Sequence, residues 1–187
     1  EIIENIPPRS FKVSKNVIAY ISNLGDFIIW DKGDINEIQY QAPSWYSCGE
    51  DFVAFVDDMN AFSIYHNGEV QQLLTYKPDM IRIKDNVLVY TDDFGALYAF
   101  FNGEVLRLNS FTPDKVLLDK DVVVFRDNYG YLKGMLRGKK MVFSKEIVRI
   151  NPGDTIFWKA TDRGHNVEMI SKNGVPDGVE KFKSKVG

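Results

Sequence analysis

Residues 87–109 read VLVYTDDFGALYAFFNGEVLRLN, and this stretch decides the fold class. Val87 to Tyr90 is apolar at every position, which is typical of a strand that is covered on both faces. The turn Asp92-Asp93-Phe94-Gly95 separates it from a second apolar run, Ala96 to Phe101. Asn102-Gly103 is a strong hairpin signal because both positions tolerate positive φ. The stretch therefore predicts short antiparallel strands joined by tight turns.

The same pattern returns every 35 residues. Four apolar runs keep this step: residues 17–20, 52–55, 87–90 and 122–125. Four polar pairs follow them at the same step: Ser22-Asn23, Asp57-Asp58, Asp92-Asp93 and Asp127-Asn128. Glycines recur at 33, 68, 103 and 138, and prolines at 43, 78 and 113. A fixed period of this length indicates a repeat architecture.

Each repeat unit reads as four short strands. In the third unit, the two strands after the apolar pair are Val105 to Leu108 and, beyond a turn at Pro113, Lys115 to Leu118. Small four-stranded sheets arranged around an axis form a β-propeller. We therefore predict an all-β fold with a propeller-like array in residues 1–135, with a β-solenoid or a sandwich as alternatives. Three full units and part of a fourth are too few to close most rings, so we expect a partial domain.

Composition and charge exclude several classes of protein. The chain has 187 residues, a net charge of -3 and a single cysteine, Cys48. Its longest apolar run, Ala96 to Phe101, is far shorter than the roughly 18–20 residues that span a bilayer. Neither a membrane span nor a nucleic-acid partner is therefore expected. Residues 139–187 carry ten Lys or Arg and six Asp or Glu, whereas residues 1–138 carry 13 and 20, which suggests two different units.

The repeat region offers little catalytic chemistry. Nucleophile-elbow, phosphate-loop and H-E-x-x-H motifs are absent from the sequence, so we predict that the chain is not an enzyme. The acidic pairs lack the alternating ligands of a calcium loop and are interpreted as turn residues. Cys48 aligns with Ile83 and Leu118 and reads as a small buried apolar residue. His66 aligns with Phe101 and is not expected to be a ligand.

A different pattern begins at Met141. The distinctive motifs are M-V-F (141–143), N-P-G-D-T-I-F (151–157), D-R-G-H-N-V-E (162–168), V-P-D-G-V-E (175–180) and K-F-K-S-K (181–185). Over these motifs the chain resembles the cupredoxins, and most closely the pseudoazurin family. The resemblance implies that residues 136–187 are the N-terminal part of a Greek-key β-sandwich, here truncated, with one type 1 copper used for one-electron transfer.

The resemblance also implies a metal ligand. It makes His165 the first copper ligand and gives Asn166 a bracing role beside it. The family's other ligands, a Cys, a second His and a Met, have no counterpart up to Gly187. We therefore expect the copper in the complete protein and no tight binding by this chain. The alternative for His165 is an exposed loop histidine without a ligand role.

Partners and location follow from the same resemblance. A lysine-rich face, here Lys181, Lys183 and Lys185, implies an acidic redox protein as partner, with a plain solvated surface as the alternative. The family further implies a periplasmic or otherwise exported protein. The alternative function is that of a non-catalytic module, in which the repeat region binds a protein or a glycan.

Overall fold

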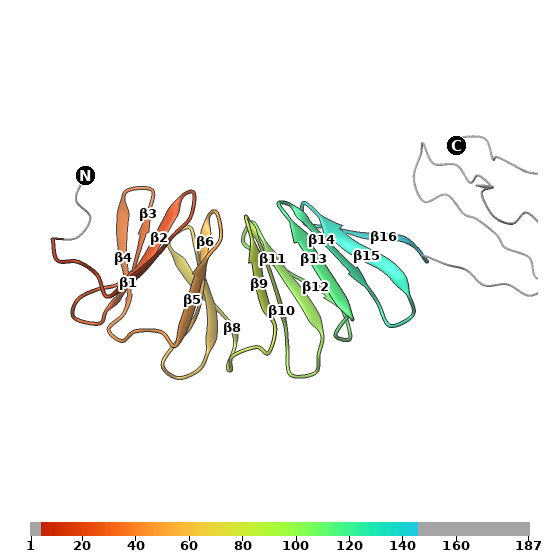
Figure 1. Cartoon of the computed structure of the whole chain (residues 1–187), viewed down its shortest axis with the longest axis horizontal. Helices are drawn as coiled ribbons and strands as arrows, with labels where there is room; N and C mark the ends of the chain where they lie inside the picture. The colour runs from red at the N-terminus through yellow and green to blue at the C-terminus, as the bar shows by residue number, and fades with distance from the viewer. Residues whose placement is uncertain (1–4, 146–187) are drawn as a thin grey trace, which may run out of the picture. The chain divides into compact units, whose positions relative to one another are not determined.

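The computed structural model describes residues 5–145, which form sixteen strands and no helix (Figure 1). None of these residues therefore belongs to a helix that could cross a membrane. The strands form four antiparallel sheets of four strands each. The prediction of an all-β, propeller-like array is confirmed for this part of the chain. Of the predicted cupredoxin segment 136–187, residues 136–145 are described and the rest lies outside the described residues.

Each sheet is a meander in which the strands follow the order of the chain. The first contains β1 (Ser10–Val13), β2 (Val17–Ile21), β3 (Phe27–Asp31) and β4 (Asp34–Gln39). The second contains β5 (Trp45–Cys48), β6 (Phe52–Val56), β7 (Phe62–His66) and β8 (Glu69–Leu74). The third contains β9 (Ile81–Lys84), β10 (Val87–Thr91), β11 (Leu97–Phe101) and β12 (Glu104–Asn109). The fourth contains β13 (Lys115–Asp119), β14 (Val122–Arg126), β15 (Tyr131–Leu136) and β16 (Lys139–Lys145).

Each sheet begins one strand earlier in the chain than the repeat unit predicted from the sequence. The strand predicted at Lys115 to Leu118 as the last of the third unit is β13 (Lys115–Asp119), which pairs with β14 of the fourth sheet. A tight hairpin explains this pairing, because only residues 120–121 separate Asp119 from its partner Val122. The connection before β13 is longer and contains Pro113, so it carries the chain across to the next sheet.

The predicted asparagine–glycine hairpins are confirmed. Asn67 and Gly68 have φ of 50° and 85°, and Asn102 and Gly103 have φ of 49° and 85°. Both residues of each pair adopt the left-handed region that this two-residue turn requires. The turns hold the third and fourth strands of their sheets in register.

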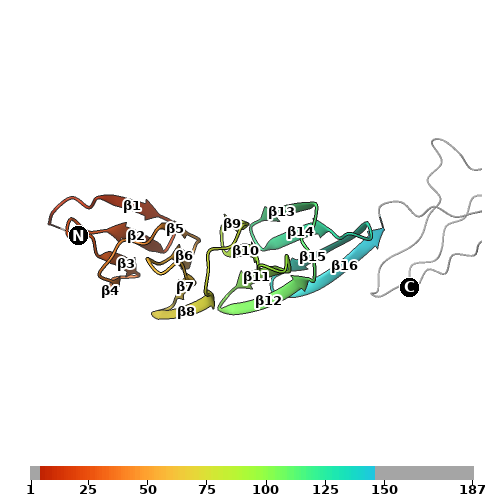
Figure 2. The same cartoon turned by 90° about the horizontal axis from the view of Figure 1, so that it is seen from below.

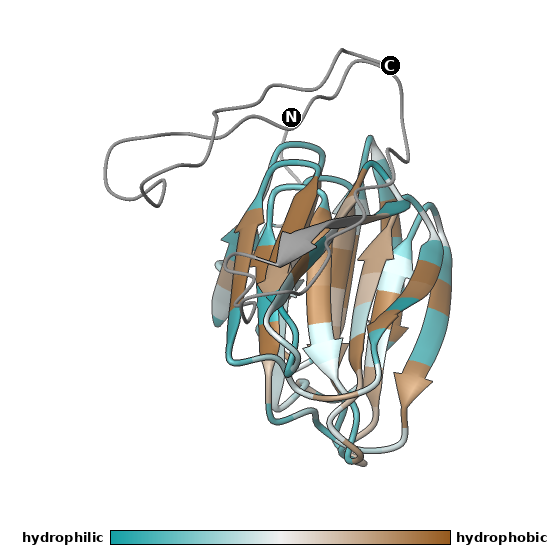
Figure 3. Cartoon of the chain, turned by 90° about the vertical axis from the view of Figure 1, so that its right-hand side faces the viewer, coloured by the Kyte–Doolittle hydropathy of each residue, from teal (hydrophilic) through white to brown (hydrophobic). Residues whose placement is uncertain are grey.

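Neighbouring sheets follow one another along the chain (Figures 1 and 2) and pack through apolar faces. Between the first and second sheets, the ring of Phe27 lies 5.2 Å from Tyr46 and 5.3 Å from Phe55. Between the second and third, Phe52 lies 5.3 Å from Phe100. The strands are accordingly rich in apolar residues, while the turns at their ends are largely polar (Figure 3). Full burial of each such side chain stabilises the fold by roughly 1.5–3 kcal/mol.

Polar contacts between sheets repeat with the same period. Asn16 donates from its amide to Asp51 across the first interface, and Asn86 donates to Asp121 across the third, at 2.9 Å. In each case the two residues are 35 positions apart. The repeat in the sequence is therefore also a repeat in how one sheet contacts the next.

The described residues 5–145 all belong to one compact unit. Its fourth sheet includes β16, which begins at Lys139. The domain boundary near residue 135 stays a prediction.

Candidate functional site

The copper residues implied by the resemblance, His165 and Asn166, lie outside the described residues. Within residues 5–145, no group of three His, Cys, Asp or Glu side chains could hold a metal ion. The described residues therefore do not provide a type 1 copper site. The assignment of copper to His165 stays a prediction.

Cys48 lies at the end of β5, where it packs against the apolar cluster between the first and second sheets. Burial raises the pKa of its thiol to about 11. A thiol with a raised pKa is a poor nucleophile and a poor metal ligand, because both roles require the thiolate. The predicted packing role of Cys48 is confirmed, but the side chain is half-buried and not fully buried as expected.

His66 lies at the end of β7, beside the interface of the second and third sheets. Its ring is 5.6 Å from the ring of Phe100, at an interplanar angle of 77°. It lines a pocket of about 140 Å³ with Ile64, Glu69, Gln71, Phe100 and Gly103. The edge-on ring contact gives His66 a packing role, and Glu69 is the only other candidate metal ligand in this lining.

The acidic pairs are turn residues, as predicted. Oδ1 of Asp92 accepts hydrogen bonds from the backbone N–H groups of Phe94 and Ala96, at 3.0 and 2.8 Å. Oδ1 of Asp127 accepts from Tyr129 and Tyr131 in the same way, at 2.9 and 2.8 Å. Carboxylates used to cap backbone groups define the shape of a turn and need no metal.

The first two sheets build the same turn with different residues. Asp57 accepts from the N–H of Ala61 at 2.7 Å, and the hydroxyl of Ser22 accepts from Leu24, Gly25 and Asp26. A serine hydroxyl replaces the carboxylate because either oxygen can accept these hydrogen bonds. The turn is therefore defined by one capping oxygen in every sheet.

One exposed feature of these turns was not predicted. Large apolar side chains stand two residues after each cap, namely Leu24, Met59, Phe94 and Tyr129, which we call the turn-tip row. Their side chains are 68–84% exposed. The signal that could have found them is their spacing, because all four keep the 35-residue step.

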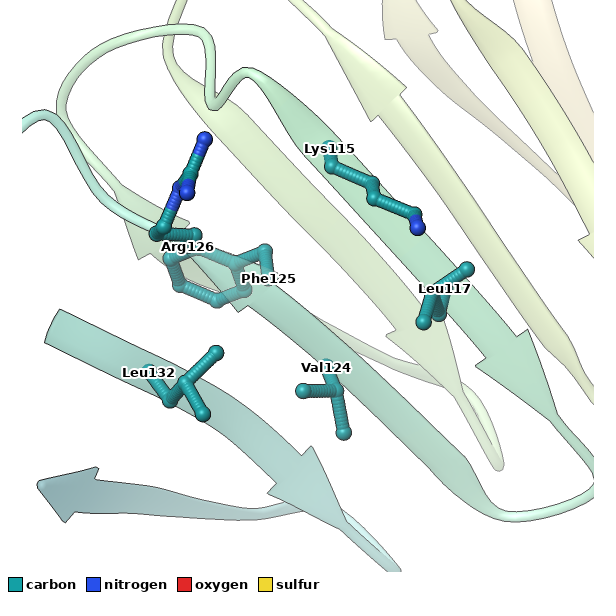
Figure 4. Close-up of a pocket in the computed structure, with 6 residues that line it drawn as sticks. All are labelled: Lys115, Leu117, Val124, Phe125, Arg126 and Leu132. Carbon is teal, nitrogen blue, oxygen red and sulfur yellow. The ribbon is translucent and has the colours of Figure 1, made fainter. Parts of the chain in front are cut away.

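A second open feature is the face of the fourth sheet that points away from the third. Leu117, Val124 and Leu132 line a pocket of about 290 Å³ there, together with Lys115, Phe125 and Arg126 (Figure 4). Across the sheet, Val123 and Met135 are fully buried against the third sheet. This open face is apolar because its residues repeat those of the third sheet, where the same face is covered by the fourth sheet.

The chain is similar to known proteins in two different regions. A model of the "10-bladed beta propeller domain" family matches residues 1–150, and the four repeated sheets agree with it. The chain belongs to this family. A second model, "Copper binding proteins, plastocyanin/azurin family", matches residues 131–187. The chain thus combines a propeller module with a cupredoxin segment, and the two matches overlap at residues 131–150.

The relatives of the second segment are pseudoazurins. That of Methylorubrum extorquens is 50% identical over 50 residues, which are 27% of this chain and 33% of the relative. That of Paracoccus pantotrophus is 54% identical over 46 residues, which are 25% of this chain and 31% of the relative. The chain therefore spans about a third of the length of these relatives, and the cupredoxin resemblance is confirmed.

Two solved structures illustrate a distant likeness. The computationally designed Ika8 protein has a TM-score of 0.38 and 14% identity, over 71% of this chain and 46% of that chain. PorZ, a surface component of the type-IX secretion system of Porphyromonas gingivalis, has a TM-score of 0.44 and 12% identity, over 79% of this chain and 22% of that chain. Likeness at this level carries no information about function.

Proposed function

We propose that the complete protein carries a type 1 copper site in its cupredoxin part and transfers single electrons between redox partners. The observation that supports this most is the match of residues 131–187 to the copper-binding family, together with about 50% identity to pseudoazurins. The motif D-R-G-H-N-V-E lies within that match and supplies the candidate ligand, His165. The protein is then an electron carrier, and no bond-making chemistry is assigned to it.

His165 and Asn166 have separate tasks in this proposal. A neutral imidazole is a suitable ligand for copper, and copper would supply the one-electron redox step. Asn166 would brace the site through hydrogen bonds, which orient ligands and tune the reduction potential. The family's remaining ligands, a Cys, a second His and a Met, would complete the site.

The basic character of the C-terminal segment suggests the partner. Lys181, Lys183 and Lys185 would attract an acidic redox protein, since complementary charge raises the rate of encounter. We also propose a periplasmic or otherwise exported location, which suits a pseudoazurin-like carrier.

The test is a copper titration of the full-length protein. Addition of cupric ion is expected to produce the intense visible band of a copper–thiolate bond at one equivalent. His165→Ala should abolish the band. His66→Gln, a matched histidine change in the propeller, should leave it intact. A colourless wild-type protein, or an undiminished band in His165→Ala, would contradict the proposal.

The partner assignment has its own measurement. Reduction of the copper by hexacyanoferrate(II), a polyanion, should be slower after the change of all three lysines to glutamine. Its dependence on ionic strength should also weaken, because steering acts within a Debye length of about 10 Å at 0.1 M salt. Equal rates and equal salt dependence in the two proteins would show that these lysines do not steer anionic partners.

A further inference from the structure

The turn-tip row is a regular feature of the propeller surface. Each sheet contributes one large apolar residue, Leu24, Met59, Phe94 or Tyr129, at the same place in the same turn. Scattered single apolar residues are ordinary on a protein surface, but a series repeated at one structural position is not. The turns themselves do not require these side chains, because their shape is set by the capping oxygens.

The capping oxygens fix the backbone of the turns that carry the row. In the third sheet, Asp92 holds the N–H groups of Phe94 and Ala96, and Gly95 donates its N–H to the carbonyl of Asp92 at 3.0 Å. In the fourth, Asp127 holds its turn by the same contacts and also forms an ion pair with Lys133 at 2.8 Å. A backbone that is already fixed lowers the entropy that is lost when a partner binds.

The row lies at one end of the sheets, alongside the connections between them. The hydroxyl of Tyr76, in the connection before the third sheet, donates to Oδ1 of Asp93 at 2.7 Å. Thr112, in the connection after it, donates to the carbonyl of Gly95 at 3.0 Å. Phe111, next to Thr112, is exposed and adds apolar surface to this end.

The spacing of the row suits an extended polypeptide. Packed sheets lie about 10 Å apart, so neighbouring tips should be separated by about that distance. A polyproline II helix has three residues per turn and rises about 3.1 Å per residue. One side chain in three would therefore meet one tip after another.

The charge of the row indicates the chemistry of the partner. Asp58 and Asp93 are exposed beside Met59 and Phe94, the two central tips. Among residues 5–145, neither carboxylate forms an ion pair, and nor do Asp57 and Asp92. The centre of the row is therefore apolar and negatively charged, which favours a ligand with positive charge between its apolar side chains.

We propose that the turn-tip row is a docking site for a basic, extended polypeptide segment with apolar side chains at intervals of three residues. A glycan is disfavoured because Leu24 and Met59 offer no aromatic face for a sugar ring. An anionic membrane surface is disfavoured because the carboxylates would repel it. This site goes beyond electron transfer and does not depend on the copper proposal.

The test uses the whole chain and a synthetic peptide, Pro-Lys-Leu repeated four times. Binding is measured by fluorescence anisotropy at low salt. Two control peptides replace either Lys by Glu or Leu by Ser, so that charge and apolar character are tested separately. The basic apolar peptide is expected to bind at least about tenfold more tightly than either control, a difference typical of a few lost anchor contacts.

Variants of the chain locate the site. Replacement of all four tips by serine should weaken binding at least about tenfold, and Asp58→Asn with Asp93→Asn should weaken it and its salt dependence. The matched control is Ile35→Ser with Val70→Ser, two exposed apolar residues on β4 and β8, and should change affinity less than twofold. Circular dichroism checks that each variant is folded. Equal binding by the tip variant, equal binding of the acidic peptide, or binding of a glycan array without the peptide would each overturn the proposal.

Discussion

The third and fourth sheets share one sequence pattern but differ in what covers them. Val89 and Leu97 of the third sheet are fully buried against the fourth. Val124 and Leu132 stand at the corresponding positions, 35 residues later, and line the open pocket on the far face of the fourth sheet (Figure 4). Identical or similar residues are therefore fully buried in one sheet and only half-buried in the next.

The difference shows that burial in this fold is a property of the interface between sheets. A β-propeller sheet has two apolar faces, and each becomes core only when a neighbouring sheet packs on it. The contribution of a side chain to the free energy of unfolding should therefore depend on whether a neighbouring sheet covers it, and not on its position in the repeat.

The largest expected effect separates two leucines at the same repeat position. Leu97→Ala should lower the free energy of unfolding by about 2–5 kcal/mol, because it leaves a cavity in a packed interface. Leu132→Ala should cost less than about 1 kcal/mol, since its side chain lines an open pocket. Urea unfolding of the full chain followed by circular dichroism measures both. Equal losses would mean that the far face of the fourth sheet is covered in solution.

The second prediction compares the capping carboxylates of the two sheets. Asp127→Ala removes the acceptor for two backbone N–H groups and the partner of Lys133, and should cost about 1–3 kcal/mol. Asp92→Ala removes the same caps without an ion pair and should cost less. The measurement is the urea midpoint of each variant at neutral pH. A larger loss for Asp92→Ala would show that the ion pair does not strengthen the fourth turn.

The pH dependence of Asp127 provides an independent check. Burial alone would raise the pKa of Asp127, but hydrogen bonds from Lys133 and from the N–H groups of Tyr131 and Tyr129 outweigh it and lower the pKa. The unfolded chain has an aspartate pKa of about 3.9, so the carboxylate contributes its stability above that pH. This contribution is lost as the pH falls through the lowered folded value. Asp127→Asn should therefore show a flatter decline in stability between about pH 5 and pH 2, and an unchanged decline would contradict the assignment.

The smallest expected effect on stability concerns the side chain that contacts the second carboxylate oxygen of the capping aspartate. The Tyr98 hydroxyl donates to Oδ2 of Asp92 at 3.1 Å, at the position that Lys133 occupies in the fourth sheet. Tyr98→Phe should cost about 0.5–1.5 kcal/mol, the value of one hydrogen bond, because the stacked ring contact with Tyr90 is retained. Lys133→Met should cost more, since it leaves Asp127 buried without its counter-charge. A double-mutant cycle with Asp92→Ala isolates the hydroxyl contribution.

Several features of the propeller fold can be predicted from the sequence. The 35-residue step, the strand at Val87 and the hairpin at Asn102-Gly103 were predicted and are confirmed. The placement of the strand Lys115 to Leu118 in the third unit was wrong. It pairs with β14 of the fourth sheet, because a tight hairpin joins these two strands. The turn-tip row was not predicted, because exposed apolar residues neither form a core nor shape a turn, and only their 35-residue spacing marks them.

Local chemistry alone accounts for the strands, the caps and the left-handed hairpins, since each depends on residues a few positions apart. The resemblance of the motif D-R-G-H-N-V-E (162–168) to the cupredoxins can likewise be seen in the sequence alone. Which apolar faces are buried depends on contacts between residues about 35 or more positions apart, as between Phe52 and Phe100. That choice belongs to the tertiary structure, because an apolar strand face has no preference for a particular neighbour until a second sheet excludes water from it.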